Sequence, residues 1–207
     1  MKKSLILMPG IAASLIFIIL FNVSAYAYQC DRIRTKTIRL HIIAESDNEE
    51  DQHIKLEIRD AILKTTPEIF DGTVNTENAH ILINKKTELI TETANNILKK
   101  HNKSYTAKTE LITEYFDTRI YDNNIIMPAG KYLALKVTIG KGKGANWWCI
   151  MFPPLCIPVV ESIINDENIY NDDEIKVIKN NSDYEIRLKL IEYIEKIKNK
   201  VDNKFIR

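Results

Sequence analysis

An apolar run at the N-terminus limits where the rest of this chain can work. Two lysines precede the run, which extends from Leu5 to Val23. Ala25 and Ala27 then supply small residues at the two positions that a signal peptidase reads. A basic start, an apolar middle and an A-x-A end are typical of an export signal. We therefore predict that residues 1–27 are a signal peptide that is cleaved after Ala27.

The same run approaches the roughly 20 apolar residues that span a bilayer, so an uncleaved membrane anchor is the alternative. In both cases the rest of the chain lies outside the cytoplasm, where a disulfide can persist. Without residues 1–27 the chain carries 27 basic and 28 acidic residues, a formal net charge of −1. Charge this balanced gives no electrostatic reason to bind nucleic acid, which usually needs a concentrated basic face.

Length and cysteine content exclude further classes of protein. A chain of 207 residues can bury the core of one domain with appendages. Three cysteines are too few for a disulfide scaffold. The four histidines are scattered, whereas a zinc cage needs closely spaced ligands. We predict no metal site and no cofactor.

Hydrophobic periodicity predicts a strand followed by a helix after the N-terminal segment. Residues 37–44 alternate as a strand with one buried face. Ser46 and Glu49 then have the S-x-x-E spacing of a capping box, in which each side chain satisfies a backbone N–H at the helix start. The helix is predicted to run to about Thr65 and to end at Pro67.

The second half of the chain is rich in strand patterns, and residues 132–139 alternate most cleanly. The order of elements predicts an α+β fold, a small and mostly antiparallel sheet with helices packed on one face. The other elements that we expect are a helix at 77–100, a strand at 106–121, a turn-rich segment at 122–131, a loop at 140–146, a strand at 147–152 and an amphipathic helix at 182–207.

We predict that one domain carries the function. It comprises residues 37–157 and follows an N-terminal linker at 28–36. Residues 158–181 are acidic, rich in Asn and poor in aromatic anchors, and we interpret them as a second linker. The C-terminal helix at 182–207 completes the chain.

The most unusual stretch of the domain is Asn-Trp-Trp-Cys, followed by a Pro-Pro pair. Adjacent residues of a strand point to opposite faces, so Trp147 and Trp148 cannot fill the same core. One interpretation is a recognition surface for a protein partner, because large aromatic side chains dominate interface energetics. That surface would comprise Asn146, Trp147, Trp148, Pro153 and Pro154. The alternative is that one Trp fills the core while the other packs under a loop or linker.

Cys149 and Cys156 lie seven positions apart across the two prolines. In an oxidising compartment a disulfide between them would restrict the unfolded chain by roughly 2–3 kcal/mol. Two free, buried cysteines are the alternative. With the disulfide, Cys30 stays unpaired near the N-terminus.

Charged residues around the first strand–helix corner have a structural interpretation. We expect Ser46, Asp47 and Glu49 to begin the helix, with their acids near its positive end. Arg59 and Asp60 lie in the same helix, and Arg59 could pair with Glu45 or Asp47 to fix the corner, or be ordinary exposed helix charge.

The alternative function is an exported hydrolase with an acidic or Cys/His site. It predicts a cleft where Asp47, Asp60, His41 or Cys149 converge.

Two long segments resemble a known family. IRLHIIAESDNEEDQHIKLEIRDAILK (38–64) and MPAGKYLALKVTIGKGKGANWWCIMFPPLC (127–156) are similar to the two signature regions of the stage II sporulation protein R family. The resemblance implies a signalling protein of endospore formation, exported from the forespore into the space between the two septal membranes. It implies no enzymatic activity and no cofactor. Its partner would be a membrane-bound aspartic protease that cleaves the precursor of the mother-cell sigma factor E. Membrane association would be transient, through the N-terminal signal.

Overall fold

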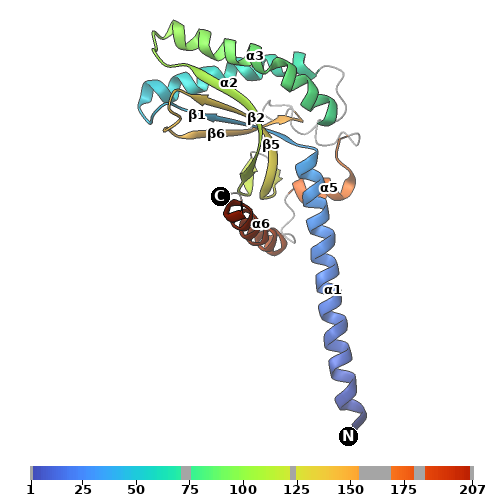
Figure 1. The fold of residues 1–207 in the computed structure, drawn as a ribbon. Helices are drawn as coiled ribbons and strands as arrows, with labels where there is room; N and C mark the ends of the chain where they lie inside the picture. Colours follow the sequence, from blue (N-terminus) through green and yellow to red (C-terminus); the bar gives the residue numbers. More distant parts are fainter. Residues whose placement is uncertain (1, 71–75, 122–124, 154–168, 180–184, 206–207) are drawn as a thin grey trace.

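Alternating apolar residues build a four-stranded sheet, which the computed structural model places at the centre of the fold (Figure 1). The structure describes residues 2–70, 76–121, 125–153, 169–179 and 185–205. The strand order is β2 (Ala107–Phe116), β5 (Gly130–Ile139), β1 (Ile38–Ile43) and β6 (Asn146–Phe152). Strand β1 runs parallel to β5 and antiparallel to β6, and β2 runs antiparallel to β5. The predicted α+β class with a mostly antiparallel sheet is confirmed.

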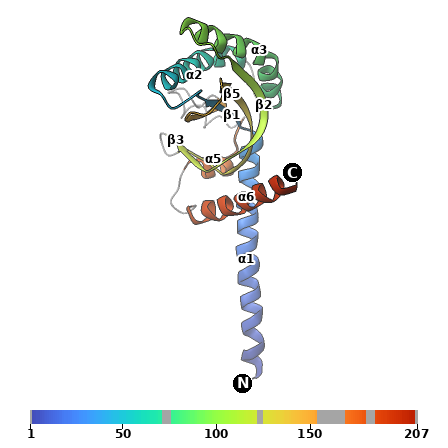
Figure 2. The same ribbon diagram turned by 60° about the vertical axis from the view of Figure 1, so that its left-hand side comes forward.

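Two helices cover one face of this sheet, as Figures 1 and 2 show. They are α2 (Glu49–Phe70) and α3 (Thr76–Lys100). Every second residue of β1 points toward them, so that Leu40 lies between Leu135 and Cys149 in the sheet and under the helices. The main core therefore consists of aliphatic side chains from the strands and the helices, including Ile38, Leu40, Ile42, Ile54, Ile58, Ile62, Ile83 and Ile90.

The predicted beginning and end of α2 are both wrong. The helix begins at Glu49. Asn48 precedes it, and Asn48 Oδ1 accepts the backbone N–H of Asp51 at 2.7 Å. Ser46 instead donates its hydroxyl to the Asp51 carboxylate at 2.6 Å, so Ser46 and Glu49 form no capping box. At the other end the helix continues past Pro67 to Phe70. The side chain of Phe70 is buried and contacts Phe152, and this burial offsets the backbone hydrogen bond that proline cannot donate.

The strand predicted at 106–121 is divided. Strand β2 ends at Phe116, and β3 (Arg119–Tyr121) pairs antiparallel with β4 (Ile125–Met127) in a second, two-stranded sheet. The residues of β4 fall within the segment that we expected to be only turns. Ile125, Ile126 and Met127 are buried, which explains why an apolar triplet occurs between turn residues.

A second core cluster joins the N-terminal helix to the domain. Helix α1 (Lys2–Thr35) includes residues 28–35 of the predicted linker, so this segment is part of a continuous helix. Tyr26, Cys30 and Ile33 are buried where α1 meets β4 and the short helix α5 (Asp172–Ile178). Helix α5 lies within the predicted linker at 158–181, and that prediction is wrong for residues 169–179, which fold against α1.

The N-terminal part of α1 projects away from the domain (Figures 1 and 2). The segment Gly10–Thr35 is, by its length and composition, apolar enough to cross a membrane. An export signal near the N-terminus has the same properties, so the alternatives of a cleaved signal and an anchor both stay open.

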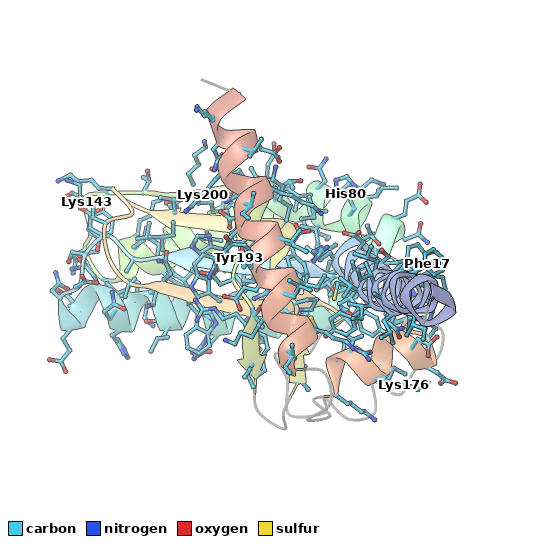
Figure 3. All side chains as sticks on the ribbon, turned by 90° about the horizontal axis from the view of Figure 1, so that it is seen from below. Phe17, His80, Lys143, Lys176, Tyr193 and Lys200 are labelled. Carbon is cyan, nitrogen blue, oxygen red and sulfur yellow. The ribbon has the colours of Figure 1, made fainter. Side chains whose placement is uncertain are left out.

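The predicted C-terminal helix is present as α6 (Glu185–Phe205). Leu188 and Ile191 are buried in the second cluster. In Figure 3, which looks at the molecule from below, α6 lies across the front of the domain, while α1 is seen nearly end-on.

A buried carboxylate fastens α5 to the end of α1. Glu174 has no exposed surface, and its two oxygens lie 2.6 Å from Arg32 Nε and 2.6 Å from Lys36 Nζ. It also completes the α5 capping box with Asn171. Burial alone would raise the pKa of Glu174, but the hydrogen bonds from Lys36 and Arg32 hold this pKa below its ordinary value.

We expect Glu174→Gln to lower the free energy of unfolding at pH 7 by about 1–3 kcal/mol, because it leaves two cations with a neutral partner. A carboxylate with a depressed pKa stabilises the fold above its unfolded pKa of about 4.3 and loses this effect as the pH falls through the folded pKa. The difference between wild type and variant should therefore shrink on acidification. Thermal unfolding of the full chain in detergent, followed by circular dichroism at several pH values, measures both effects.

Asp173→Asn is the matched control, since Asp173 is an exposed neighbour whose carboxylate lies 2.9 Å from Lys176 Nζ on the surface of α5. It should change stability by no more than about 0.5 kcal/mol. Equal losses in the two variants would contradict a special role of Glu174.

Candidate functional site

An unusual polar cluster lies on the face of the sheet that points away from α2 and α3, and it includes a side chain of β1. His41 is buried, and its Nδ1 lies 2.5 Å from Glu114 Oε1 on β2. Its Nε2 lies 2.8 Å from Asn146 Oδ1 on β6. The imidazole also stacks on Trp148, with 3.6 Å between ring centroids and 22° between ring planes. We call His41, Glu114, Lys136, Asn146 and Trp148 the His41 cluster.

Glu114 is the acidic side chain of the His41 cluster, and it lies beside two basic side chains. Glu114 Oε2 lies 3.4 Å from Lys136 Nζ on β5, while Oε1 faces His41. Burial would raise the pKa of Glu114, but hydrogen bonding to His41 and the nearby Lys136 charge hold this pKa below its ordinary value. The carboxylate therefore stays ionised at neutral pH between two basic groups, and it fixes the orientation of the imidazole.

Aromatic rings extend the His41 cluster along the sheet. Phe116 meets the Trp148 ring edge-on, with 5.0 Å between centroids, and Arg119 lies 5.8 Å from the centroid of the same indole. Trp148 is only partly buried and Asn146 is exposed, so this end of the cluster reaches the surface. A half-buried indole beside a guanidinium and an exposed amide suits the recognition of another protein.

Arg39 is the fully buried neighbour of His41 on the same face of β1. Its guanidinium carbon lies 4.5 Å from the ring centroid of Phe116 and 5.1 Å from that of Tyr132. Nη2 donates to the Tyr121 hydroxyl at 2.5 Å, whereas Nε and Nη1 have no hydrogen-bond partner within the described residues. Arg39 thus connects the main sheet to β3 through ring contacts and one hydrogen bond.

The structure divides the predicted recognition surface between two faces of the sheet. Trp148 and Asn146 belong to the His41 cluster, whereas Trp147 lies on the helix side, with Arg59 4.3 Å from its ring centroid. Pro153 is buried, and Pro154 lies outside the described residues. Of the four predicted residues that the structure describes, only Asn146 and Trp148 share one accessible surface, and their role in binding stays a prediction.

The predicted disulfide is not settled by the described residues. Cys149 is buried on the helix face of β6, but Cys156 lies outside the described part of the chain. The pairing of these two cysteines therefore stays a prediction. Cys30 is a free, buried thiol in the second core cluster.

A second set of motif residues holds the loop before β6 against the corner between β1 and α2. Asp47 Oδ1 accepts the backbone N–H of Ala145 at 2.6 Å, and Lys55 donates to the carbonyl of Ala145 at 3.1 Å. Glu45 accepts the backbone N–H of Lys141. These contacts fix the loop that leads into Asn146 and Trp148, so the corner positions the accessible end of the His41 cluster.

Two further carboxyl groups of the corner differ in their surroundings. Asp51 accepts hydrogen bonds from Ser46 and from the hydroxyl of Tyr105, and these bonds hold its pKa below the ordinary value despite burial. Glu49 is exposed in the first turn of α2. Arg59 pairs with neither Glu45 nor Asp47; it lies 2.7 Å from the exposed Asp60 and covers Trp147.

The residues of the hydrolase alternative do not converge. His41 and Cys149 lie on opposite faces of the sheet, which separates the imidazole from the sulfur. Asp47 is engaged by the loop backbone, and Asp60 lies on α2, on the helix side. Among the described residues, no group of three or more His, Cys, Asp or Glu side chains could hold a metal ion.

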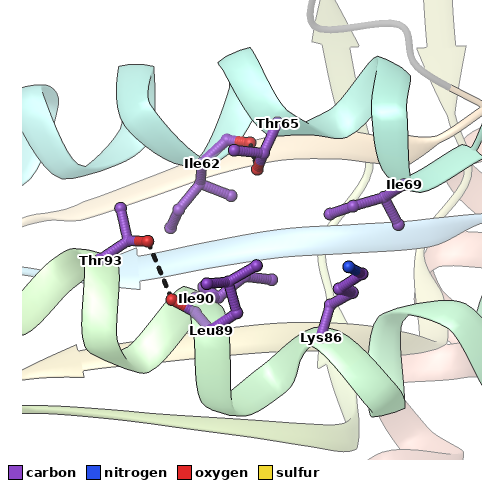
Figure 4. Close-up of a pocket in the computed structure, with 7 residues that line it drawn as sticks. All are labelled: Ile62, Thr65, Ile69, Lys86, Leu89, Ile90 and Thr93. Atoms are coloured by element: carbon purple, nitrogen blue, oxygen red, sulfur yellow. Dashed lines mark hydrogen bonds between the residues drawn. The ribbon is translucent and has the colours of Figure 1, made fainter.

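A small cavity lies between α2 and α3 (Figure 4). Its volume is about 60 Å³, far below the roughly 300 Å³ of small-molecule sites. Its lining is Ile62, Thr65, Ile69, Lys86, Leu89, Ile90 and Thr93. We interpret it as a packing defect between two helices.

Comparison with known proteins bears on the same residues. The family model for stage II sporulation protein R matches residues 34–162, which include β1, the corner and β6. The chain belongs to the stage II sporulation protein R family. A relative from Bacillus subtilis (strain 168), named "Stage II sporulation protein R", is 37% identical over 124 residues. These residues are 60% of this chain and 55% of the Bacillus protein, so the chain spans about half the length of that relative. No solved structure matches the chain.

Sequence reasoning missed three residues on the polar face of the sheet, namely Arg39, Glu114 and Lys136. Each is a charged residue within a strand, where charge usually indicates the solvent side. A signal was present, since Arg39 and His41 share the strand face opposite Leu40, and a guanidinium and an imidazole on one strand face require polar or aromatic partners.

Gly144 tests whether the corner positions the loop. A Cβ at this position would meet the carbonyl group of Ser46, which is backbone and cannot rotate away. We expect Gly144→Ala to lower the free energy of unfolding by about 1–3 kcal/mol. The variant should also raise the fluorescence of Trp148, because the indole loses contact with His41. Lys143→Ala, at an exposed neighbouring position, is the control and should leave both measurements unchanged.

Proposed function

We propose that this protein is an exported signal of endospore formation that activates a membrane-bound aspartic protease. The protease then processes the precursor of the mother-cell sigma factor E. The protein is made in the forespore and acts in the space between the two septal membranes. It is a ligand on this proposal, and its binding energy shifts the protease toward its active state.

The meeting of the two signature segments at one accessible site carries the proposal. His41 comes from the first segment, and Asn146 and Trp148 come from the second. The imidazole contacts both of them directly. Membership of a sporulation family and an N-terminal apolar helix support export and a sporulation role. The accessible face of the His41 cluster is then the contact surface for the protease.

The same geometry favours a ligand over an enzyme. Both ring nitrogens of His41 are occupied by fixed protein oxygens, and the ring face is covered by Trp148. A general base needs a nitrogen that can reach a substrate or a nucleophile. In this cluster the imidazole instead orients the indole and the amide that reach the surface.

Reconstitution in a non-sporulating host tests the proposal. Cells would export this protein together with the matching receptor protease and a tagged sigma-factor precursor, and precursor cleavage would be followed by gel. We expect cleavage only when this protein is exported. A receptor protease with a substituted catalytic aspartate should abolish cleavage, which assigns the chemistry to the protease rather than to this chain.

Two neighbouring tryptophans give a matched pair of variants. Trp148→Ala should reduce precursor cleavage at least about tenfold, since a central aromatic anchor commonly contributes 2 kcal/mol or more to binding. Trp147→Phe, on the opposite face, should retain most of the cleavage. Circular dichroism and export levels show whether both variants fold. Unchanged activation by a folded Trp148→Ala variant would remove the His41 cluster from the contact surface.

A further inference from the structure

Helix α6 exposes a continuous apolar stripe. It consists of Ile186, Leu190, Tyr193, Ile197 and Val201, of which Ile186 is 85% and Tyr193 64% exposed. At about 100° per residue these side chains lie within one narrow arc of the helix surface. The buried Leu188 and Ile191 lie on the other side, against the domain. The helix therefore has two apolar faces, one buried in the second core cluster and one uncovered within the described structure.

Two glutamates of α6 lie toward its buried face, whereas most of its exposed charged side chains are basic. Glu192 and Glu195 are 20% and 12% exposed and pair with Lys196 and Lys198. Glu195 also lies 3.6 Å from Arg34 of α1. The exposed charged side chains beside the stripe are mainly basic, and they are Arg187, Lys189, Lys196, Lys198, Lys200 and Lys204. Basic residues thus flank the apolar stripe on both sides.

The position of α6 points the stripe toward the free half of α1. Figures 1 and 2 show α6 below the sheet, on the side where α1 projects from the domain. Figure 3 shows that its axis runs across that of α1. The contact between Arg34 and Glu195, and the pair of Lys131 with Asp202 at 2.6 Å, fasten α6 in this orientation.

The geometry points to α6 as an interfacial helix that lies on the surface of an anionic bilayer. With α1 along the membrane normal, α6 lies along the membrane plane, next to the segment where the apolar run ends. The stripe then enters the boundary between headgroups and acyl chains, and the flanking lysines contact anionic lipid headgroups. Tyr193 has the amphipathic ring that is enriched at this depth.

A second copy of this chain fits the stripe less well. Two α6 helices that met along their stripes would bring the flanking lysines of both copies together, and like charges at an interface oppose binding. Anionic headgroups neutralise Lys189, Lys200 and Lys204, for which the described residues offer no ion pair. Charge complementarity therefore favours the lipid surface as the occupant.

Depth-dependent quenching tests this inference with the full chain. The protein would be reconstituted in nanodiscs containing phosphatidylglycerol, with an NBD fluorophore on Ile197→Cys and a nitroxide lipid labelled near the headgroups. We expect at least about twofold quenching and a blue-shifted emission. The same fluorophore on Lys85→Cys, an exposed position of α3 on the far side of the sheet, should show neither effect.

Two further arms make the result decisive. Leu190→Ser combined with Tyr193→Ser should reduce quenching at position 197, and circular dichroism would show that these exposed substitutions leave the fold intact. Replacing phosphatidylglycerol by a zwitterionic lipid should reduce quenching as well. If position 197 is quenched no more than position 85, α6 does not lie on the bilayer. Protection from an aqueous quencher without lipid quenching would assign the stripe to a protein partner and overturn the inference. Neither result depends on protease activation, so this test and that of the proposed function fail independently.

Discussion

Strand β1 is paired on both sides and covered on both faces, and this constraint organises the rest of the structure. Its hydrogen bonds are taken by β5 and β6, so the two sequence segments that contain these strands must meet at β1. Its aliphatic side chains face α2 and α3 and are buried in the main core. The intervening Arg39 and His41 must then point to the opposite side, where His41 contacts Glu114 and Asn146 and Arg39 donates one hydrogen bond to Tyr121. The His41 cluster follows from that requirement.

Much of the sheet could be predicted because its strands have a buried side with a period of two. Residues 132–139 and 37–44 are correct within two residues, since Leu40 and Leu135 mark one face unambiguously. The helix at 77–100 is also confirmed, and its apolar residues repeat at helical spacing. The local hydrophobic pattern was sufficient to predict a strand or helix wherever that element buries one face against the core.

Predictions failed where a contact distant in sequence decides the outcome. Pro67 is a local signal to end a helix, but the burial of Phe70 against Phe152 extends α2 beyond it. The acidic segment around Glu174 resembles a linker until Arg32 and Lys36, more than a hundred residues away, supply its partners. In the candidate site, Trp148 could be predicted from the sequence because tryptophan is a rare residue. Glu114 has no local distinction, and the register pairs it with Tyr132 rather than with a strand neighbour of His41, so only the folded sheet brings its carboxylate to the imidazole.

The burial of Tyr26, Cys30 and Ile33 has a consequence for the order of events after export. A signal peptidase requires an extended stretch of chain, yet the bond after Ala27 lies within α1, next to the buried Tyr26. If a signal peptidase cleaves this chain after Ala27, docking of this segment and cleavage compete with each other. A chain that is cut first leaves the membrane without Tyr26 in its core, whereas a chain that docks first protects the bond and stays tethered. On that prediction, the relative rates of folding and proteolysis decide whether the protein keeps its N-terminal helix.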